Sequence, residues 1–246
     1  GDHAGSADNG GKSVHIRGNA VVADEVSVLG ELEFTGGSNS VNMLRVSYEY
    51  GAGFIISAGS INITDVLVVN ADLSSGAITL SGTADAIINN VTLYGNDGAG
   101  LYNNSSGSVS IVNSIIWGNG SSIPGSGIGN SVVTYSDIQG GYTGTGNIEL
   151  DPLFVAAANG DFNLDLLSPC IDTGDPNAVY DTDSTVADMG AFPRLRQFLT
   201  GTSDGDITVS ADTTVIITED FTVSETDTMQ LEAGAELYFG PGVTLT

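Results

Sequence analysis

Five aspartates lie close together in the segment "CIDTGDPNAVYDTDSTVADMG", and carboxylates at such spacing can bind calcium. Calcium takes about six to eight oxygen ligands, which carboxylates and backbone carbonyls on a loop supply. Asp181 and Asp183 have the spacing of the first two ligands of an EF-hand loop, but its Gly and Glu do not follow. The segment therefore predicts either a calcium site or aspartates that cap the turns of an irregular chain. The candidate ligands are Asp172, Asp175, Asp181, Asp183 and Asp188.

Two aromatic residues, Tyr94 and Trp117, occupy equivalent places in two similar stretches of the chain. The stretch "NNVTLYGN" ends at Asn96, and "VNSIIWGN" ends at Asn119 one repeat later. If the two stretches are stacked, the rings lie one above the other. Such a pair either offers a surface on which a sugar stacks or packs for structural reasons.

The same alignment pairs Asn90 with Asn113 and Asn96 with Asn119. We expect Asn90 and Asn113 to form a stacked amide pair at an internal turn, with each amide bonding to the next coil. The glycines before Asn96 and Asn119 are expected to supply positive φ at the adjacent bend. A ladder of asparagines that binds sugars is the functional alternative.

The elements that must position these residues recur with an irregular period of about 22 to 25 residues, which is typical of a solenoid. Each unit holds short strands with partial alternation between Gly, Asn, Ser and Asp, and no window from 14 to 145 sustains a helical apolar stripe. The Leu-rich consensus of leucine-rich repeats is missing. An all-β, right-handed parallel β-helix, with coils stacked at about 4.8 Å, is the predicted fold. Its core is expected to contain Val91, Leu93, Ile111 and Ile116 in one stack.

Four regions follow from this pattern. Residues 1–13 form a flexible N-terminal segment, and residues 14–142 form the coils of the β-helix. Residues 143–200 form an irregular Asp-rich segment that packs on the solenoid. Alternation of apolar and polar residues returns in 201–246, which we expect to form C-terminal strands that begin a further β-solenoid stretch.

The net charge of −25 excludes two classes of partner. Nucleic acids and anionic membrane surfaces are both bound through Lys and Arg, of which the chain has only five. No apolar run reaches the roughly 18–20 residues of a membrane span, so direct membrane insertion is not expected. The single cysteine, Cys170, is expected to be a small buried hydrophobic residue rather than a redox group.

The run "NSIIWGN…VTYSDIQGGYTGTGNIELDPLF…GDFNLDLLSPCIDTGDPN…DTDSTVADMGAF" resembles a large group of secreted bacterial right-handed parallel β-helix proteins. In these proteins a coil that ends in Trp-Gly-Asn leads into "DPLF" and "SPCIDTGDP" segments and closes on an Asp-x-Gly-Ala-Phe/Tyr element. The resemblance covers about residues 85–193. It implies a secreted or cell-surface bacterial protein, often a long one with a sorting anchor, and it is specific to the fold rather than to a reaction.

Enzymes of polysaccharide cleavage also use the β-helix fold, and they need particular side chains. A lyase that acts on uronates needs a basic residue to remove a proton, but no Lys or Arg lies between Arg45 and Arg194. A galacturonase-type hydrolase needs paired carboxylates within signatures that this chain lacks. The two histidines, His3 and His15, lie near the N-terminus without partners of a catalytic triad.

These observations favour a non-enzymatic extracellular protein, either a structural surface protein or part of an adhesin, with calcium as the one expected cofactor. The alternative is a β-helix that binds or cleaves polysaccharide. Strands at the ends of a solenoid expose unpaired backbone groups, and "ELYFGPGVTLT" carries one charge and no helical cap. We therefore expect identical chains to associate end to end, and such a contact makes a filament where it does not close into a ring.

Overall fold

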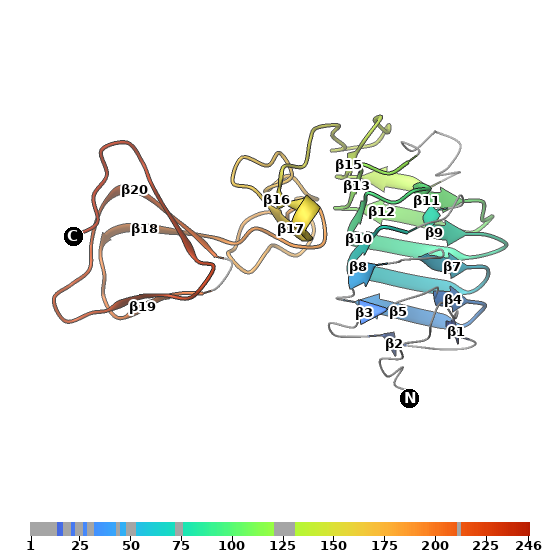
Figure 1. Cartoon of the computed structure of the whole chain (residues 1–246), viewed down its shortest axis with the longest axis horizontal. Coiled ribbons are helices and arrows are strands. Elements are labelled where there is room, and N and C mark those ends of the chain that lie inside the picture. Colours follow the sequence, from blue (N-terminus) through green and yellow to red (C-terminus); the bar gives the residue numbers. More distant parts are fainter. Residues whose placement is uncertain are drawn as a thin grey trace. The chain divides into compact units, whose positions relative to one another are not determined.

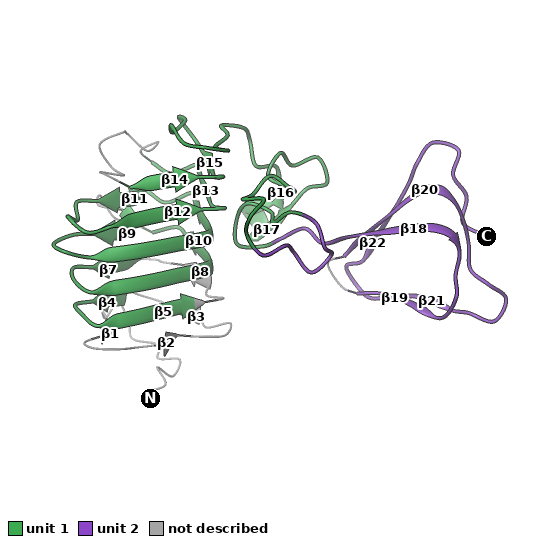
Figure 2. Cartoon of the chain, turned by 180° about the vertical axis from the view of Figure 1, so that it is seen from behind, with its two compact units in different colours: residues 1–178, 186–192 green, residues 179–185, 193–246 purple. Residues whose placement is uncertain are grey.

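The computed structural model describes residues 14–16, 21–22, 27–28, 32–42, 45–47, 53–71, 76–120, 131–210 and 213–246. The predicted flexible segment 1–13 lies outside these residues. The chain forms two compact units: unit 1 comprises Gly1–Ala178 and Val186–Phe192, and unit 2 comprises Val179–Thr185 and Pro193–Thr246 (Figure 2). Its strands stack in parallel coils that make a β-solenoid of about eight turns, which confirms the predicted parallel β-helix.

Unit 1 contains two parallel sheets whose strands alternate along the chain (Figure 1). Each strand pairs in parallel with a strand of a neighbouring coil, and several coils contribute two short strands to the larger sheet. The five-stranded sheet has the order β1 (Val14–Ile16), β4 (Leu32–Phe34), β7 (Phe54–Ile56), β9 (Gly76–Leu80) and β11 (Ala99–Asn103). The ten-stranded sheet has the order β14 (Val132–Thr134), β12 (Val109–Val112), β10 (Asp85–Tyr94), β8 (Ser60–Val69), β5 (Ser38–Asn42) and β2 (Val21–Val22), extended by β3 (Ser27–Val28), β6 (Arg45–Ser47), β13 (Ile115–Trp117) and β15 (Asp137–Ile138).

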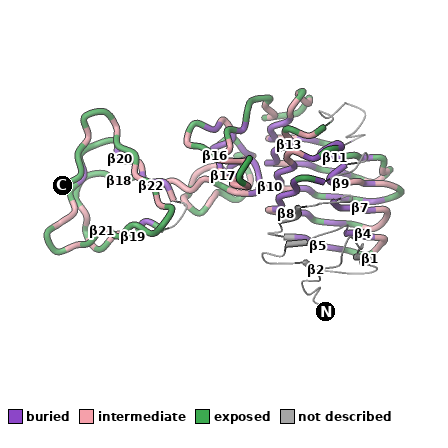
Figure 3. The backbone as a smooth tube through the Cα atoms, viewed as in Figure 1, coloured by how far each residue is buried: buried purple, intermediate pink, exposed green. Residues whose placement is uncertain are grey.

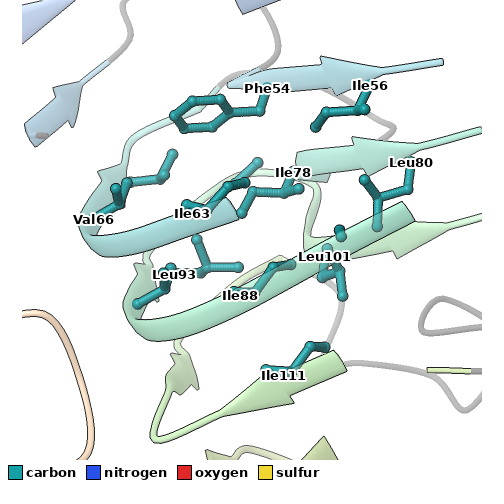
Figure 4. Packing of buried hydrophobic residues seen from close by; sticks show 14 of the residues in the cluster. Phe54, Ile56, Ile63, Val66, Ile78, Leu80, Ile88, Leu93, Leu101 and Ile111 are labelled. Atoms are coloured by element: carbon teal, nitrogen blue, oxygen red, sulfur yellow. The ribbon is translucent and has the colours of Figure 1, made fainter. Parts of the chain in front are cut away.

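The register of these strands stacks like residues above like residues. Ile88 lies opposite Ile111, and Leu93 lies opposite Ile116. The predicted core residues Val91, Leu93, Ile111 and Ile116 are all buried in one cluster, as predicted. Figure 4 shows Leu93 and Ile111 among other residues of this cluster, and Figure 3 shows buried positions along the strands of the coils. Alternate residues of β12 and of the first halves of β8 and β10 fill the interior of the coil, while their neighbours face outward. In the second halves of β8 and β10 consecutive residues are buried.

The ten-residue strands β8 and β10 bend at one residue with a left-handed backbone. Asp65 and Asn90 have φ of 53° and 51°, and they occupy the same place in successive coils. Asn113 and Tyr135 repeat that conformation in the next two coils, with φ of 49° and 48°. Asn and Asp tolerate this conformation better than most residues, which explains their recurrence at the corner.

Residues 143–192 do not continue the regular coils. This part of the chain contains a short antiparallel pair, β16 (Phe154–Ala156) and β17 (Asp161–Leu164), joined by the 3-10 helix η1 (Ala157–Asn159). Two residues of β17, Phe162 and Leu164, are buried. The irregular segment thus has its own apolar side, which packs against the ends of the unit 1 strands.

Unit 2 is a second, smaller stack of parallel strands. One sheet has the order β18 (Arg196–Thr202), β20 (Thr214–Thr222) and β22 (Glu236–Phe239), and β19 (Ile207–Val209) pairs with β21 (Met229–Leu231). The core of this unit is built on Val209, Val215, Ile217 and Phe221. The alternation of apolar and polar residues in this part of the sequence therefore forms parallel coils, as in unit 1.

Candidate functional site

The Asp-rich segment uses its carboxylates to bind its own backbone. Oδ1 of Asp175 accepts hydrogen bonds from the N–H of Asn177 (2.9 Å) and from its side-chain amide (3.1 Å). Oδ1 of Asp183 accepts from the N–H (3.1 Å) and hydroxyl (2.7 Å) of Thr185, and its Oδ2 accepts from the N–H of Arg196 (2.7 Å). The contacts with Asn177 and Thr185 are Asx turns, which organise an irregular chain, whereas the bond from Arg196 joins this segment to β18.

The other three predicted calcium ligands also take part in local structure. Asp188 is buried, and its Oδ1 accepts a hydrogen bond from the N–H of Asp172 at 2.7 Å. The N–H of Asp181 donates to the carbonyl of Thr185 at 3.1 Å. Asp172, Asp175 and Asp188 belong to unit 1, whereas Asp181 and Asp183 belong to unit 2.

No metal-ion arrangement is formed by three or more His, Cys, Asp or Glu side chains within the part of the chain that the structure describes. The contacts of the five aspartates favour the turn-forming alternative. Calcium binding at Asp172, Asp175, Asp181, Asp183 and Asp188 stays a prediction.

The aromatic pair Tyr94 and Trp117 is in register, as the repeat predicts. The ring of Tyr94 meets Phe154 at 5.4 Å and Phe162 at 5.3 Å, both edge to face. Trp117 packs against a second buried cluster that includes Cys170. Because the irregular segment packs on both rings, their arrangement supports the structural alternative rather than a sugar platform.

The hydrogen-bonded amide pair lies at Asn96 and Asn119. The side-chain N–H of Asn96 donates to Oδ1 of Asn119 at 2.8 Å, and its backbone N–H donates to the same oxygen at 3.1 Å. Asn119 in turn donates to the carbonyl of Leu93 at 3.0 Å. The glycines before these residues have φ of 63° and 68°, as predicted. The amide ladder that joins successive coils is thus formed by Asn96 and Asn119 at the Gly-Asn bend.

Asn113 has a different partner. Its Oδ1 accepts a hydrogen bond from the N–H of Asp175 at 2.7 Å, and its carbonyl accepts one from Gly190 at 2.7 Å. Asn90, one coil earlier, is half-buried at the same corner. Asn113 therefore attaches the irregular segment to the coils, a role that spacing alone does not reveal.

A buried carboxyl–thiol pair, which sequence reasoning missed, lies where the irregular segment meets the last coil of unit 1. Asp137 is fully buried, and its Oδ2 accepts a hydrogen bond from Sγ of Cys170 at 3.3 Å. Its Oδ1 accepts from the N–H of Leu150 at 3.1 Å. The repeat alone could have identified Asp137 as a buried carboxyl group, because it occupies the place that the apolar Ile115 holds in the preceding coil.

Burial sets the ionisation of this pair. It raises the pKa of Asp137 to about 6, against the lowering effect of the hydrogen bonds from Leu150 and Cys170. The negative charges of Asp151 and Glu149 contribute to the same rise of the pKa. Burial and the neighbouring Asp137 also raise the pKa of the Cys170 thiol, which makes Cys170 an inert buried residue, in line with its predicted role.

A shallow groove of about 570 Å³ runs across the outer face of β8, β10 and β12. Ile87 and Val132 project into it, and serines and Asn62 lie along its sides. Asp85 is the one ionisable group among the described residues that line it, and its Oδ1 accepts a hydrogen bond from the N–H of Ser108 at 2.7 Å. Glycoside hydrolysis uses two carboxyl groups, so these lining residues do not form a hydrolytic pair.

None of the helical segments in the described ranges has the length and hydropathy that a membrane crossing requires. Comparison of the chain with protein-family models, with curated protein sequences and with solved structures gave no significant match.

Proposed function

We propose that the chain is a structural β-solenoid of the bacterial cell surface, and that it acts through its rigidity and its repeated outer surface. The observation that carries this proposal is the use of buried polar side chains. Oγ of Ser114 accepts a hydrogen bond from the N–H of Val91 at 3.2 Å, and Oγ of Ser136 accepts from the N–H of Ser114 at 3.1 Å. Together with Asn96 and Asn119, these groups join one coil to the next.

Such contacts support a structural role because these polar side chains bind the backbone of a neighbouring coil and are not available to bind or attack a substrate. Each buried hydrogen bond between coils contributes about 0.5–1.5 kcal/mol to stability, and the repeat adds these contributions coil by coil. The groove beside β10 holds one carboxylate among its described lining residues, and that carboxylate bonds to the next coil. The competing function, cleavage of polysaccharide, finds no such support in these contacts.

The resemblance of residues 85–193 to secreted β-helix proteins supports the location. The test is to label intact cells of the source bacterium with antibodies raised against the folded chain, with a cytoplasmic protein as control. Labelling of intact cells is the expected result. Labelling that appears only after lysis contradicts the proposed surface location.

The catalytic alternative needs a separate assay. The full chain is incubated with a panel of neutral and acidic polysaccharides, with and without calcium, and new reducing ends and unsaturated products are measured. We expect no product under any of these conditions. Turnover that the variant Asp85→Asn abolishes would replace the structural proposal with an enzymatic one.

Association of identical chains end to end belongs to the same proposal, and it stays a prediction. Static light scattering over a wide concentration range tests it directly. We expect the apparent mass to rise with concentration, whereas a constant monomer mass contradicts the assembly.

A further inference from the structure

The outer face of the sheet β18–β20–β22 in unit 2 carries a row of three apolar side chains, of which the two outer ones are exposed and the middle one, Ile216, is half-buried. Phe198 pairs in register with Ile216, and Ile216 pairs with Tyr238, so the three residues stand on the same face of successive coils. Phe198 is 56% exposed and Tyr238 is 44% exposed. The aromatic pair of unit 1 differs in that Phe154 and Phe162 pack on Tyr94.

A hollow of about 360 Å³ opens at one end of this row, beside Phe198. Its polar walls come from the segment that precedes β18, from the start of β18 and from the turn before β20, and include Asp183, Gln197 and Thr213. The ring of Phe198 therefore lies next to groups that can form hydrogen bonds. This combination of one apolar surface with a few polar groups is typical of sites for small polar ligands.

Charged groups of both signs lie beside the row, and Asp183 and Arg196 both line the hollow. The guanidinium of Arg194 forms an ion pair with Glu236, and its Nε donates a hydrogen bond to Thr214 at 2.8 Å. Asp183 accepts hydrogen bonds from the backbone of Arg196 and from Thr185. The net charge of −25 on the whole chain opposes the approach of acidic ligands through the long-range field of the protein.

We propose that Phe198, Ile216 and Tyr238 form a binding surface for a neutral, extended, β-linked glycan. Sugar rings present an apolar C–H face that stacks on aromatic rings, and their hydroxyl groups bind to polar neighbours such as those of the hollow. Phe198 and Tyr238 are two strand spacings apart, about 10 Å, which is close to the length of two sugar residues in such a chain. This activity goes beyond the structural role proposed above, because it gives unit 2 a ligand.

Isothermal titration calorimetry on the full chain tests this site, with cellohexaose and mannohexaose as neutral probes and oligogalacturonate as the acidic probe. We expect at least one neutral probe to bind and the acidic probe to bind much more weakly. The variants Phe198→Ala and Tyr238→Ala are each expected to weaken binding about threefold to tenfold. Tyr102→Ala is the matched control, since Tyr102 is an exposed aromatic residue on the five-stranded sheet of unit 1.

Hydrogen exchange of unit 2 confirms that each variant is folded before its affinity is measured. No binding of either neutral probe overturns the proposal, and so does equal binding of the acidic probe. Equal affinities of Phe198→Ala, Tyr238→Ala and the wild type would place the ligand elsewhere. Loss of self-association in Phe198→Ala, without any glycan binding by the wild type, would make the row a protein interface instead.

Discussion

Polar residues inside the coils differ in whether hydrogen bonds compensate the cost of their burial. Asn96 and Asn119 satisfy each other and the backbone, so their burial is compensated. Asp137 is buried without a basic residue among the groups that shift its pKa, and it is stabilised in its protonated form. The repeat predicted that asparagines would join the coils, but it did not identify Asp137, because burial of a carboxyl group breaks the pattern that the repeat establishes.

The first prediction concerns Asp137. Its pKa is about 6 when folded and about 3.9 when unfolded, so its stabilising contribution is fully present below about pH 4. That contribution is lost as the pH rises through the folded pKa. We expect the difference in unfolding free energy between wild type and Asp137→Asn to change by up to about 3 kcal/mol between pH 4 and pH 7.

Urea unfolding followed by fluorescence measures this difference, because Trp117 is the only tryptophan and lies in unit 1. A difference between wild type and Asp137→Asn that is constant across this pH range contradicts the raised pKa.

The second prediction concerns the amide ladder. Asn96→Ala leaves the buried N–H of Ala71 and the carbonyl of Val68 without the side-chain partner that they have now. We expect a loss of about 1–3 kcal/mol of unfolding free energy. Asn104→Ala is the control, because Asn104 is exposed. Equal unfolding midpoints for the two variants would contradict a stabilising role of the amide ladder.

At the scale of elements, the sequence predicted the coils and an irregular segment that packs on them, but not which residues of that segment contact the coils. Positions that recur in each coil, such as Ile88 and Ile111, identify the buried side of a strand without further information. Residues 143–192 have no such period, and Phe162 meets Tyr94 across a large separation in sequence. The covering of the aromatic pair therefore could not be predicted from local pattern.

The third prediction tests the two faces of one sheet. Ile116 is buried in the core, whereas Ile87 is 53% exposed on the outer face of the neighbouring coil. Ile116→Asp removes a large apolar contact and buries a charge, so we expect a loss of several kcal/mol of unfolding free energy. Ile87→Asp is expected to change it by less than about 0.5 kcal/mol. Similar melting temperatures for the two variants would contradict the register of β10 and β13.

At the scale of the whole molecule, the two units are expected to respond differently to acid. In unit 2, hydrogen bonds from Thr244 lower the pKa of Asp220, and a hydrogen bond from Ser203 lowers that of Asp227. A lowered pKa contributes stability above the unfolded value, and this stability is lost as the pH falls through the folded value. The sequence predicted strands in unit 2, but not which aspartates bond across its coils.

The fourth prediction follows from that difference. We expect acidification below about pH 4 to destabilise unit 2 of the wild type more than unit 2 of the double variant Asp220→Asn, Asp227→Asn. Hydrogen exchange read by mass spectrometry reports the opening of each unit separately. Identical acid profiles of wild type and double variant in unit 2 would show that these two carboxylates do not stabilise it.

The stacking of coils in one register underlies the core, the amide ladder and both aromatic rows, and disulfide formation tests it most directly. Ile87 is the register partner of Ser110, and Ser110 is the partner of Val132, with all three residues exposed. In a Cys170→Ala background, Ile87→Cys with Ser110→Cys places two thiols on strands about 4.8 Å apart, within the range of a disulfide. Ile87→Cys with Val132→Cys places them about 10 Å apart, beyond that range.

Both double variants are oxidised at low concentration, and their disulfides are mapped by mass spectrometry of peptides. We predict an intramolecular disulfide between positions 87 and 110 and none between positions 87 and 132. A disulfide between 87 and 132, or none between 87 and 110, would contradict the stacking of the coils.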